Sequence, residues 1–184
     1  MKVSYQNKHA AILDRCKNGE QKAYYEIYKL YSRAMFNICF RIVGSQEMAE
    51  DVLQEAFVSA FQNLKSYQGK ASFGAWLKRI VVNRAISYLR KNQLELVMMD
   101  DKIDVEDDAG IDENELVLKV ETIRSAIQKL PNGFRVVFSL YLLEGYDHKE
   151  IAEILQISES TSKSQYNRAK KKLKEILKEE IYYE

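Results

Sequence analysis

The sequence predicts an all-α protein, because it is poor in turn-forming residues and carries several helical apolar stripes. The 184 residues include one proline and seven glycines, whereas β-sandwiches and β-barrels need such residues at many turns. Hydrophobic residues make up 46% of the chain, enough for one mid-sized domain or two small ones to bury a core. No window approaches the roughly 20 apolar residues of a membrane span, and the first residues lack the apolar core of a signal peptide. We therefore expect a cytoplasmic protein without membrane insertion.

The net charge of +1 hides three blocks of different charge. Residues 1–94 carry 15 basic and 7 acidic side chains, residues 95–115 carry 1 and 10, and residues 116–184 carry 12 and 10. The acidic side chains of the middle block repel one another, and no helical apolar stripe persists there. We predict a flexible acidic linker at 95–115 between two helical domains, 1–94 and 116–184, each of a size that can fold independently.

In the first block, apolar residues spaced by three and four predict a helix over 20–43. Gly44 and Ser45 interrupt this pattern, and Ser45 is a suitable N-cap for the helix that follows. A second apolar stripe runs over 48–64, so we expect the two helices to pack against each other.

The second of these helices carries a polar trio on its outward side. Asp51, Gln54 and Glu55 lie at i, i+3 and i+4, so they share one face away from the apolar stripe. The residue pattern alone leaves open a simpler interpretation, in which the trio is an ordinary solvated face.

A polar loop containing Gly69 leads to Ser72, a suitable N-cap for a third helix that reaches about Arg90. Basic side chains without acidic neighbours give this helix a cationic face: Lys78, Arg79, Arg84, Arg90 and Lys91. Aromatic and basic side chains are interleaved around the loop, namely Tyr67, Phe73 and Trp76 with Lys65, Lys70, Lys78 and Arg79. This mixture is typical of surfaces that stack bases and neutralise phosphates. The alternative is that the aromatic rings belong to the core and the lysines to the solvated surface.

After the linker, an apolar stripe over 120–130 predicts a helix, and Pro131-Asn132-Gly133 indicates a helix stop followed by a turn. Apolar residues from Phe134 onward, Leu142 included, predict another helix that ends near Gly145.

Residues 146–177 predict two short helices separated by a polar turn, which is the pattern of a helix-turn-helix. Asp147 can cap the first helix, and Ser158 or Ser160 the second. The second helix is basic and begins with short polar side chains, which suit base edges and phosphates in a major groove. The candidate DNA-binding residues are Ser160, Thr161, Lys163, Ser164, Gln165, Arg168 and Lys171. An αα-hairpin with a basic solvated tail is the alternative.

The sequence carries no motif for a metal, a cofactor or catalysis. Cys16, Cys39, His9 and His148 lack metal-binding spacing, so we expect no metal and interpret the cysteines as buried or idle thiols. A Gly-rich phosphate loop, an HxE motif and a catalytic pair are likewise missing from the sequence, which argues against an enzyme.

Two stretches resemble bacterial RNA polymerase sigma factors of the extracytoplasmic-function class, and they stand in that family's order and separation. They are AEDVLQEAFVSAFQNLKSYQGKASFGAWLKRIVVNRAISYLR and LPNGFRVVFSLYLLEGYDHKEIAEILQISESTSKSQYNRAKKKL. The resemblance implies a transcription initiation factor that binds core RNA polymerase and promoter DNA and has no catalytic site. It also implies an anti-sigma factor as a partner.

The resemblance further implies a role for each candidate surface. Asp51, Gln54 and Glu55 match a DxxQE motif that docks on the clamp helices of the polymerase β′ subunit, and the β flap is a further expected contact. The loop 63–72 matches the segment that captures a base flipped out of the minus-ten element. Trp76, Arg79 and Asn83 match positions that touch the melted strand.

In the second domain, the helix 160–173 matches the reader of the minus-thirty-five element, with Lys163, Ser164, Gln165 and Arg168 at the expected contact positions. Gln165 and Ser162 stand where many relatives have arginine and a β-branched residue, so the preferred promoter sequence does not transfer. The linker would thread through the polymerase active-site cleft and RNA exit channel, with a passive spacer as the alternative.

A second function class stays open from the sequence. A stand-alone helix-turn-helix regulator would use the second domain to bind an operator and the first as a dimerisation or sensor domain. The trio of Asp51, Gln54 and Glu55 separates the two hypotheses, because it would matter only to a protein that binds polymerase.

Overall fold

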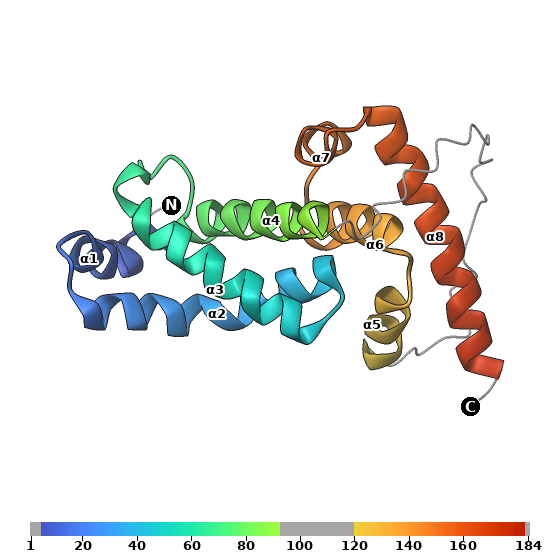
Figure 1. Ribbon diagram of the computed structural model, residues 1–184, viewed down its shortest axis with the longest axis horizontal. Helices are drawn as coiled ribbons and strands as arrows, with labels where there is room; N and C mark the ends of the chain where they lie inside the picture. The colour runs from blue at the N-terminus through green and yellow to red at the C-terminus, as the bar shows by residue number, and fades with distance from the viewer. Residues whose placement is uncertain (1–4, 93–119, 183–184) are drawn as a thin grey trace. The chain divides into compact units, whose positions relative to one another are not determined.

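The computed structural model describes the backbone of residues 5–92 and 120–182 and the side chains of residues 9–92 and 120–179. Within these ranges every regular element is a helix, which confirms the all-α prediction (Figure 1). The chain forms two compact units, unit 1 at Met1–Asn92 and unit 2 at Gln93–Glu184. The acidic linker predicted at 95–115 lies outside the described residues. Of the helices that the structure describes, none is long and apolar enough to cross a membrane.

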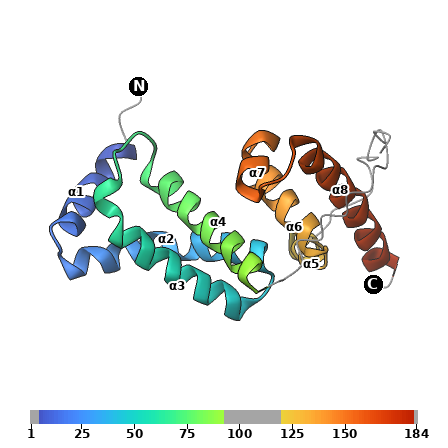
Figure 2. The ribbon, with the colours of Figure 1, turned by 45° about the horizontal axis from the view of Figure 1, so that its top comes forward.

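In unit 1, three long helices pack against one another: α2 (Gln21–Val43), α3 (Gln46–Gln62) and α4 (Phe73–Lys91). Figure 2 shows them side by side. Their apolar stripes meet in a core whose fully buried side chains include Ile27, Ile42, Val52, Leu77, Val81, Val82, Ile86 and Leu89. Burial of several such side chains, each worth about 1.5–3 kcal/mol, stabilises the arrangement.

Serine caps start both helices of unit 1 that carry candidate functional residues, as the sequence predicts. The Ser45 hydroxyl accepts a hydrogen bond from the Met48 N–H at 3.5 Å, and the Ser72 hydroxyl accepts one from the Ala75 N–H at 3.2 Å. Gly44, at φ 80°, ends α2 in the left-handed conformation that glycine adopts without strain. These caps fix which residues of α3 and α4 face outward.

Helix α1 (Tyr5–Lys17) is an element that the sequence analysis does not predict. It packs on α2, where Cys16 is buried and its carbonyl oxygen accepts a 2.7 Å hydrogen bond from the Tyr24 hydroxyl. The Arg15 guanidinium donates to the carboxylates of Glu20 and Glu26, and these hydrogen bonds raise the pKa of Arg15 and lower that of Glu20. Contacts with the following helix therefore hold α1 in place.

The prediction of buried thiols is confirmed. Cys16 and Cys39 are free and buried, and desolvation raises the pKa of Cys39 to about 12. The pKa of Cys16 is also raised, mainly by burial. Neither thiol is a thiolate near neutral pH, so both serve as small apolar side chains.

Unit 2 contains α5 (Val120–Gln128), α6 (Asn132–Phe138), α7 (His148–Leu155) and α8 (Glu159–Tyr182). Helix α8 packs against each of the other three. One buried cluster consists of Ala126, Ile127, Leu130, Phe138, Ala169 and Ile176, and Val136, Val137, Leu140, Ile151 and Leu155 are buried as well. Helix α8 is thus both the longest helix described in the unit and the one that joins the others.

Two expectations for unit 2 are wrong. Asn132 and Gly133 do not form a turn: they begin α6, because Pro131 stands at the N-cap, where its fixed φ and missing N–H are tolerated. The following helix does not continue as an α-helix either. Residues Ser139–Leu143 form a π-helical segment, η2, in which the Glu144 N–H donates to the Ser139 carbonyl at 3.0 Å. Leu142, expected on the apolar face of that helix, is 54% exposed.

A buried arginine joins α5 to α6. Arg135 is 4% exposed, and its guanidinium donates to the Leu130 carbonyl at 3.2 Å, to the Gln128 carbonyl at 3.5 Å and to Asn132 Oδ1 at 2.8 Å. Desolvation lowers the pKa of this group. The guanidinium N–H groups of Arg135 therefore supply donors to backbone carbonyl groups at and just after the C-terminal end of α5.

We expect Arg135→Met to destabilise unit 2 by about 2–3 kcal/mol, because it leaves buried carbonyl groups without a donor. The measurement is urea unfolding of the full chain followed by circular dichroism and by fluorescence of Trp76, the single tryptophan, which reports unit 1. The urea concentration at the midpoint of the dichroism transition should fall, while the fluorescence transition of Trp76 should stay unchanged. Arg124→Met, at an exposed position of α5, is the control and should change neither signal. An Arg135→Met chain as stable as the parent would contradict this capping role.

Candidate functional site

The first candidate surface lies on the outward side of α3, and we call Asp51, Gln54, Glu55 and Val58 the acidic face. Asp51, Gln54 and Glu55 are all exposed, as predicted from their spacing. Val58, one turn further along the same side, is 55% exposed. The sequence analysis missed Val58, although its position at i+3 from Glu55 and i+4 from Gln54 could have indicated it.

The opposite side of α3 is tightly packed, which holds the acidic face in a fixed position. Val52 and Ala56 are fully buried, and the Phe57 ring meets the Tyr28 ring of α2 edge to face at 4.9 Å. This packing determines which side of α3 faces outward and so where its carboxylates stand. Such a surface suits recognition of a basic partner, where charge complementarity sets register and specificity.

The second candidate surface begins at the loop between α3 and α4. The buried Leu64 side chain anchors its 3-10 turn, η1 (Leu64–Ser66). The Asn63 side-chain amide donates to the Ser59 carbonyl at 2.8 Å, and the Ser66 hydroxyl donates to the Asn63 carbonyl at 2.7 Å. The loop therefore leaves α3 along a defined path.

The tip of this loop is closed by a tyrosine hydroxyl. Tyr67 Oη donates a 2.7 Å hydrogen bond to the Ala71 carbonyl, which brings together the two ends of a turn that contains Gly69 at φ 72°. Lys65 is exposed before this closure and Lys70 within it. The hydrogen bond thus gives the loop a defined tip with a lysine at or near each end.

Three of the predicted aromatic residues form one cluster at the start of α4. Ring centroids are 5.4 Å apart for Tyr67 and Trp76, 5.6 Å for Tyr67 and Phe73, and 5.4 Å for Phe73 and Trp76. Phe73 is 4% exposed and also packs against Tyr31, so its ring belongs to the core, which argues against its predicted contact with DNA. Tyr67 and Trp76 are half-buried, and each keeps part of its ring at the surface.

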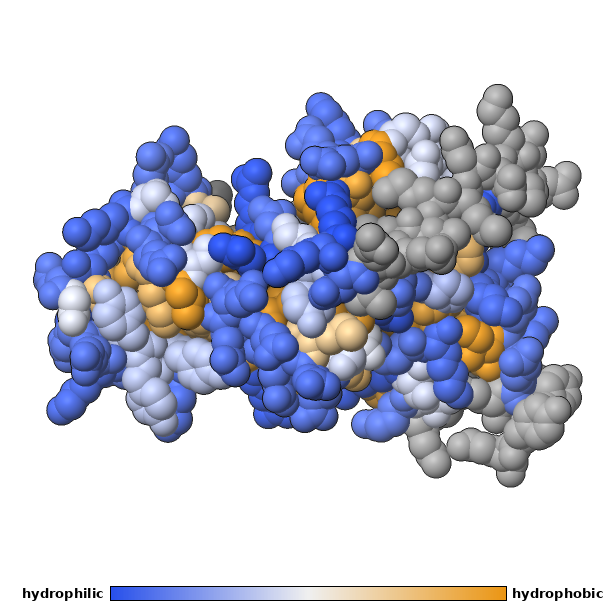
Figure 3. Space-filling model, in the orientation of Figure 1, coloured by the Kyte–Doolittle hydropathy of each residue, from blue (hydrophilic) through white to orange (hydrophobic). Residues whose placement is uncertain are grey.

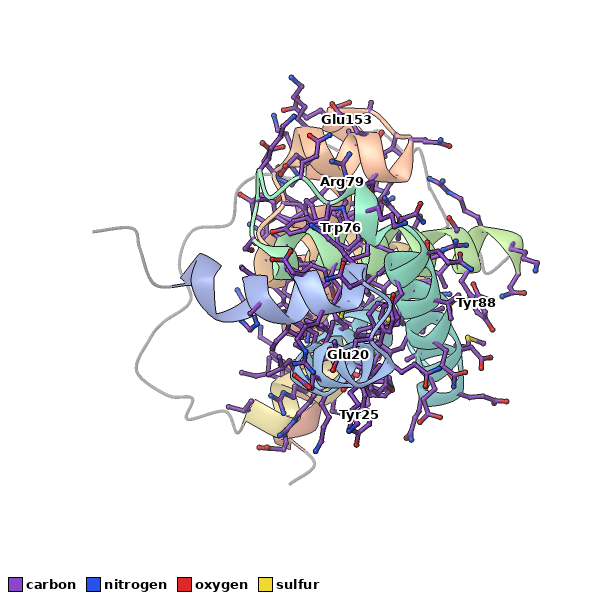
Figure 4. All side chains as sticks on the ribbon, turned by 90° about the vertical axis from the view of Figure 1, so that its left-hand side faces the viewer. Glu20, Tyr25, Trp76, Arg79, Tyr88 and Glu153 are labelled. Carbon is purple, nitrogen blue, oxygen red and sulfur yellow. The ribbon has the colours of Figure 1, made fainter. Side chains whose placement is uncertain are left out.

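Beyond the cluster, α4 presents a polar side to solvent. Trp76, Arg79 and Asn83 follow one another at intervals of three and four residues, and Arg79 and Asn83 are exposed. Figure 4 labels Trp76 and Arg79, which project from the same helix. Arg84 is exposed but lies about 100° around the helix from Asn83.

Not all basic residues that the sequence assigns to the cationic face of α4 share one side of the helix. Lys78 is half-buried and about 100° from Arg79, so it does not share the side that Arg79 occupies. Arg79, Asn83 and Trp76 remain together, beside the closed loop.

The third candidate surface is the helix-turn-helix formed by α7 and α8. A reciprocal capping box starts α7: the Glu150 N–H donates to Asp147 Oδ1 at 2.8 Å, and the Asp147 N–H donates to Glu150 Oε2 at 2.9 Å. Gln156, at φ 58°, ends the helix in the left-handed conformation. The Ser158 hydroxyl accepts the Thr161 N–H at 3.0 Å, so Ser158 rather than Ser160 caps α8.

The predicted reading residues of α8 do not all face outward. Ser160, Lys163 and Lys171 are exposed, and Thr161, Ser164 and Arg168 are half-buried. Gln165 is 3% exposed, which argues against its predicted contact with DNA. It lies on the same side of the helix as the buried Ser162 and Ala169, where α8 packs on its own unit. Asn167, half-buried and midway between the exposed Lys163 and Lys171, was missed despite its i+4 spacing to both.

A polar and aromatic contact holds the two helices of the motif together. His148 Nδ1 lies 2.9 Å from the Ser162 hydroxyl, and the His148 ring stacks on Tyr141 at 4.3 Å with an interplanar angle of 12°. The centroid of the Tyr166 ring lies 5.8 Å from that of His148 and 4.5 Å from that of Tyr141. Burial, followed by the charge of Lys163, lowers the pKa of His148, while Glu159 and Asp147 act in the opposite sense.

The candidate residues form surfaces and not an enclosed site. On the side seen in Figure 3, hydrophilic side chains cover most of the molecule and apolar residues show in small areas. Within residues 9–92 and 120–179, no three His, Cys, Asp or Glu side chains gather in a way that could hold a metal ion.

Comparison with known proteins assigns the family. Residues 27–95 match the family model "Sigma-70 region 2", and residues 121–173 match "Sigma-70, region 4". The ECF RNA polymerase sigma-E factor of Escherichia coli (strain K12) is 31% identical over 179 residues, which cover 91% of this chain and 93% of that relative. The chain belongs to the extracytoplasmic-function class of the sigma-70 family. The ECF RNA polymerase sigma factor SigW of Bacillus subtilis is 29% identical over 178 residues, covering 91% and 95% of the two chains.

Two solved structures share the fold of this sigma factor. The sigma factor RpoE from Bartonella quintana, solved in complex with the anti-sigma factor NepR, matches with a TM-score of 0.56 and 24% identity over 85% of this chain and 98% of that chain. CnrH, solved in complex with the cytosolic domain of CnrY, gives a TM-score of 0.52 and 23% identity over 91% and 96%.

Removal of the loop-closing hydroxyl should loosen the loop without unfolding unit 1. We expect Tyr67→Phe to speed amide hydrogen exchange at residues 68–71 by about two- to five-fold, since one exposed hydrogen bond is lost. The rest of unit 1 should exchange at its usual rate. Tyr88→Phe, on the half-buried side of α4, is the matched control. Unchanged exchange in the loop of Tyr67→Phe would show that the hydroxyl does not hold it.

The lowered pKa of His148 predicts a pH dependence of unit 2. A histidine whose folded pKa lies below the unfolded value of 6.5 binds fewer protons in the folded state, so its contribution to stability is complete above pH 6.5 and is lost as the pH falls through the folded pKa. His148→Asn keeps a polar atom near Ser162 and cannot titrate. We expect the parent to lose more unfolding free energy than His148→Asn between pH 7.5 and pH 5, measured by urea unfolding with dichroism. Parallel losses in the two chains would contradict the assignment.

Proposed function

We propose that this chain is an alternative sigma factor, which directs core RNA polymerase to specific promoters and starts transcription there. The observation that carries the proposal is the acidic face: Asp51, Gln54 and Glu55 stand exposed on one side of a capped and packed helix, inside the segment that matches sigma-70 region 2. In this proposal the face docks on the clamp helices of the polymerase β′ subunit. Basic side chains on the polymerase would pair with Asp51 and Glu55, and Val58 would lie against an apolar side chain between them.

The closed loop and the polar side of α4 would hold the melted minus-ten strand. Trp76 offers part of an aromatic ring for stacking, while Arg79 and the loop lysines, Lys65 and Lys70, supply positive charge for the backbone. Asn83 offers an amide that can bond a base edge or a phosphate. A base that leaves the duplex would be bound by the preformed loop, and this binding energy opens the promoter without a catalytic step.

Helix α8 would read the minus-thirty-five element from the major groove. Ser160 and Lys163 are exposed at its N-terminal half, which is the part that contacts base edges in helix-turn-helix proteins. Ser164, Asn167 and Arg168 flank them and are half-buried. Gln165 is left out of this surface because it is buried.

The proposal includes two consequences for the cell. A protein that acts together with RNA polymerase would be in the cytoplasm. An anti-sigma factor would inactivate it by covering the acidic face or the DNA-binding surfaces. The stand-alone regulator is the less supported function, because it gives no role to an exposed acidic face in a chain with two sigma regions.

The acidic face is tested by charge reversal. We expect Asp51→Arg to weaken binding to core polymerase by at least about 100-fold, because one partner of a charge pair becomes a like charge. The measurement is a titration of labelled chain with core polymerase from its own host, read by fluorescence anisotropy, with helical content checked by circular dichroism.

Asp14→Arg is the matched control, since Asp14 is an exposed aspartate of α1 in the same unit and suffers the same change of charge. It should bind core polymerase like the parent. If Asp51→Arg retained the parent affinity, the acidic face would not be the polymerase contact. If the parent chain itself failed to bind, the stand-alone regulator would be favoured.

A further inference from the structure

Helix α8 carries basic side chains along its whole outward side, well beyond its N-terminal half. Five lysines lie on its outward side within an arc of about 100°, taking 100° per residue, and we call them the lysine stripe: Lys163, Lys170, Lys171, Lys174 and Lys178. All five are exposed. The side directly opposite is buried and contains Ser162, Gln165, Ala169 and Ile176.

Two acidic residues of the C-terminal half of α8, Glu175 and Glu179, lie to one side of the stripe. Glu175 pairs with Lys172 at 3.0 Å, and Lys172 lies outside the stripe, about 100° from Lys171. Glu179 is further round the helix than Glu175, again away from the lysines. The stripe begins next to an acidic residue, because the Lys163 ammonium pairs with Glu159 at 2.7 Å, but no acidic residue lies within its arc from Lys163 to Lys178.

The stripe is longer than a groove is wide. At a rise of about 1.5 Å per residue, Lys174 and Lys178 lie roughly 16 Å and 22 Å along the helix from Lys163. A major groove is about 12 Å wide, and helix-turn-helix proteins place the N-terminal part of the reading helix in it. With Lys163 at the base edges, the C-terminal half of α8 emerges from the groove beside the phosphate backbone.

We propose that Lys174 and Lys178 extend the duplex contact of this sigma factor past the minus-thirty-five element, by binding backbone phosphates that flank it. This inference rests on the proposed function, because it takes the stripe to continue the surface that reads the promoter. The two lysines add affinity for any sequence at that place and do not select bases. Lys170, in the middle of the stripe, is positioned by Tyr166, because its ammonium group lies 5.2 Å from the centroid of the Tyr166 ring.

The test is the salt dependence of promoter binding by the holoenzyme. The full chain is assembled with core polymerase, and its affinity is measured between 0.1 and 0.4 M salt on a promoter selected for this holoenzyme in vitro. Each phosphate contact contributes about 0.9 to the slope of log affinity against log salt. The double variant Lys174→Gln with Lys178→Gln should therefore lower the slope by about 1.8, and weaken binding by about ten-fold or more at 0.1 M salt.

Lys172→Gln is the matched control, because it removes an exposed lysine of the same helix that lies off the stripe; its slope should equal that of the parent. A second arm uses a promoter fragment whose duplex ends at the edges of the minus-thirty-five element, where the double variant and the parent should bind alike. Equal slopes for the double variant and the parent on the long fragment would overturn the inference while leaving promoter binding intact. A parent holoenzyme that binds no promoter fragment would instead overturn the proposed function.

Discussion

Burial of one side of each helix is the constraint on which the rest of this structure depends. In unit 1, α2, α3 and α4 press their apolar stripes together, and whatever remains on α3 and α4 is forced to face water. The acidic face and the polar side of α4 are positioned by this packing as much as by their own chemistry. In unit 2 the same constraint acts through α8, whose buried line of small and apolar residues directs its lysines outward.

Short polar contacts then decide where each helix begins and how the intervening segments run. Ser45, Ser72, Asp147 and Ser158 satisfy backbone donors at four helix starts. Because a shift of one residue turns a helical face by about 100°, such caps have consequences for every side chain downstream. Burial of apolar side chains makes the helices pack, and a few hydrogen bonds at the helix caps determine which side of each helix is buried.

The sequence predicts the features that depend on local chemistry and periodicity. The caps, the two long apolar stripes of unit 1, the exposed trio on α3 and the helix-turn-helix all follow from spacing and residue type. Features that depend on distant partners were not predictable in this way. Helix α1 is held by Arg15 and by Tyr24 of the next helix, Phe73 is enclosed by rings from α2 and from the loop, and Gln165 faces its own unit. An aromatic or amide side chain suits a core and a nucleic acid equally well, so its type alone cannot say which one it meets.

The π-helical segment η2 bears on how the helix-turn-helix could change over evolution. Its turn between Ser139 and Glu144 holds one residue more than an α-helical turn would. Loss of a single residue from 139–143 would convert this turn into an ordinary α-helical turn that ends at about the same rotation, so the change would fall on the side chains of the segment itself. Tyr141, whose ring stacks on His148, lies in this segment, and a deletion before it would change the side that it faces. Alignments of this region should therefore tolerate substitutions at the exposed Leu142 and Leu143 more readily than any change in the length of the segment.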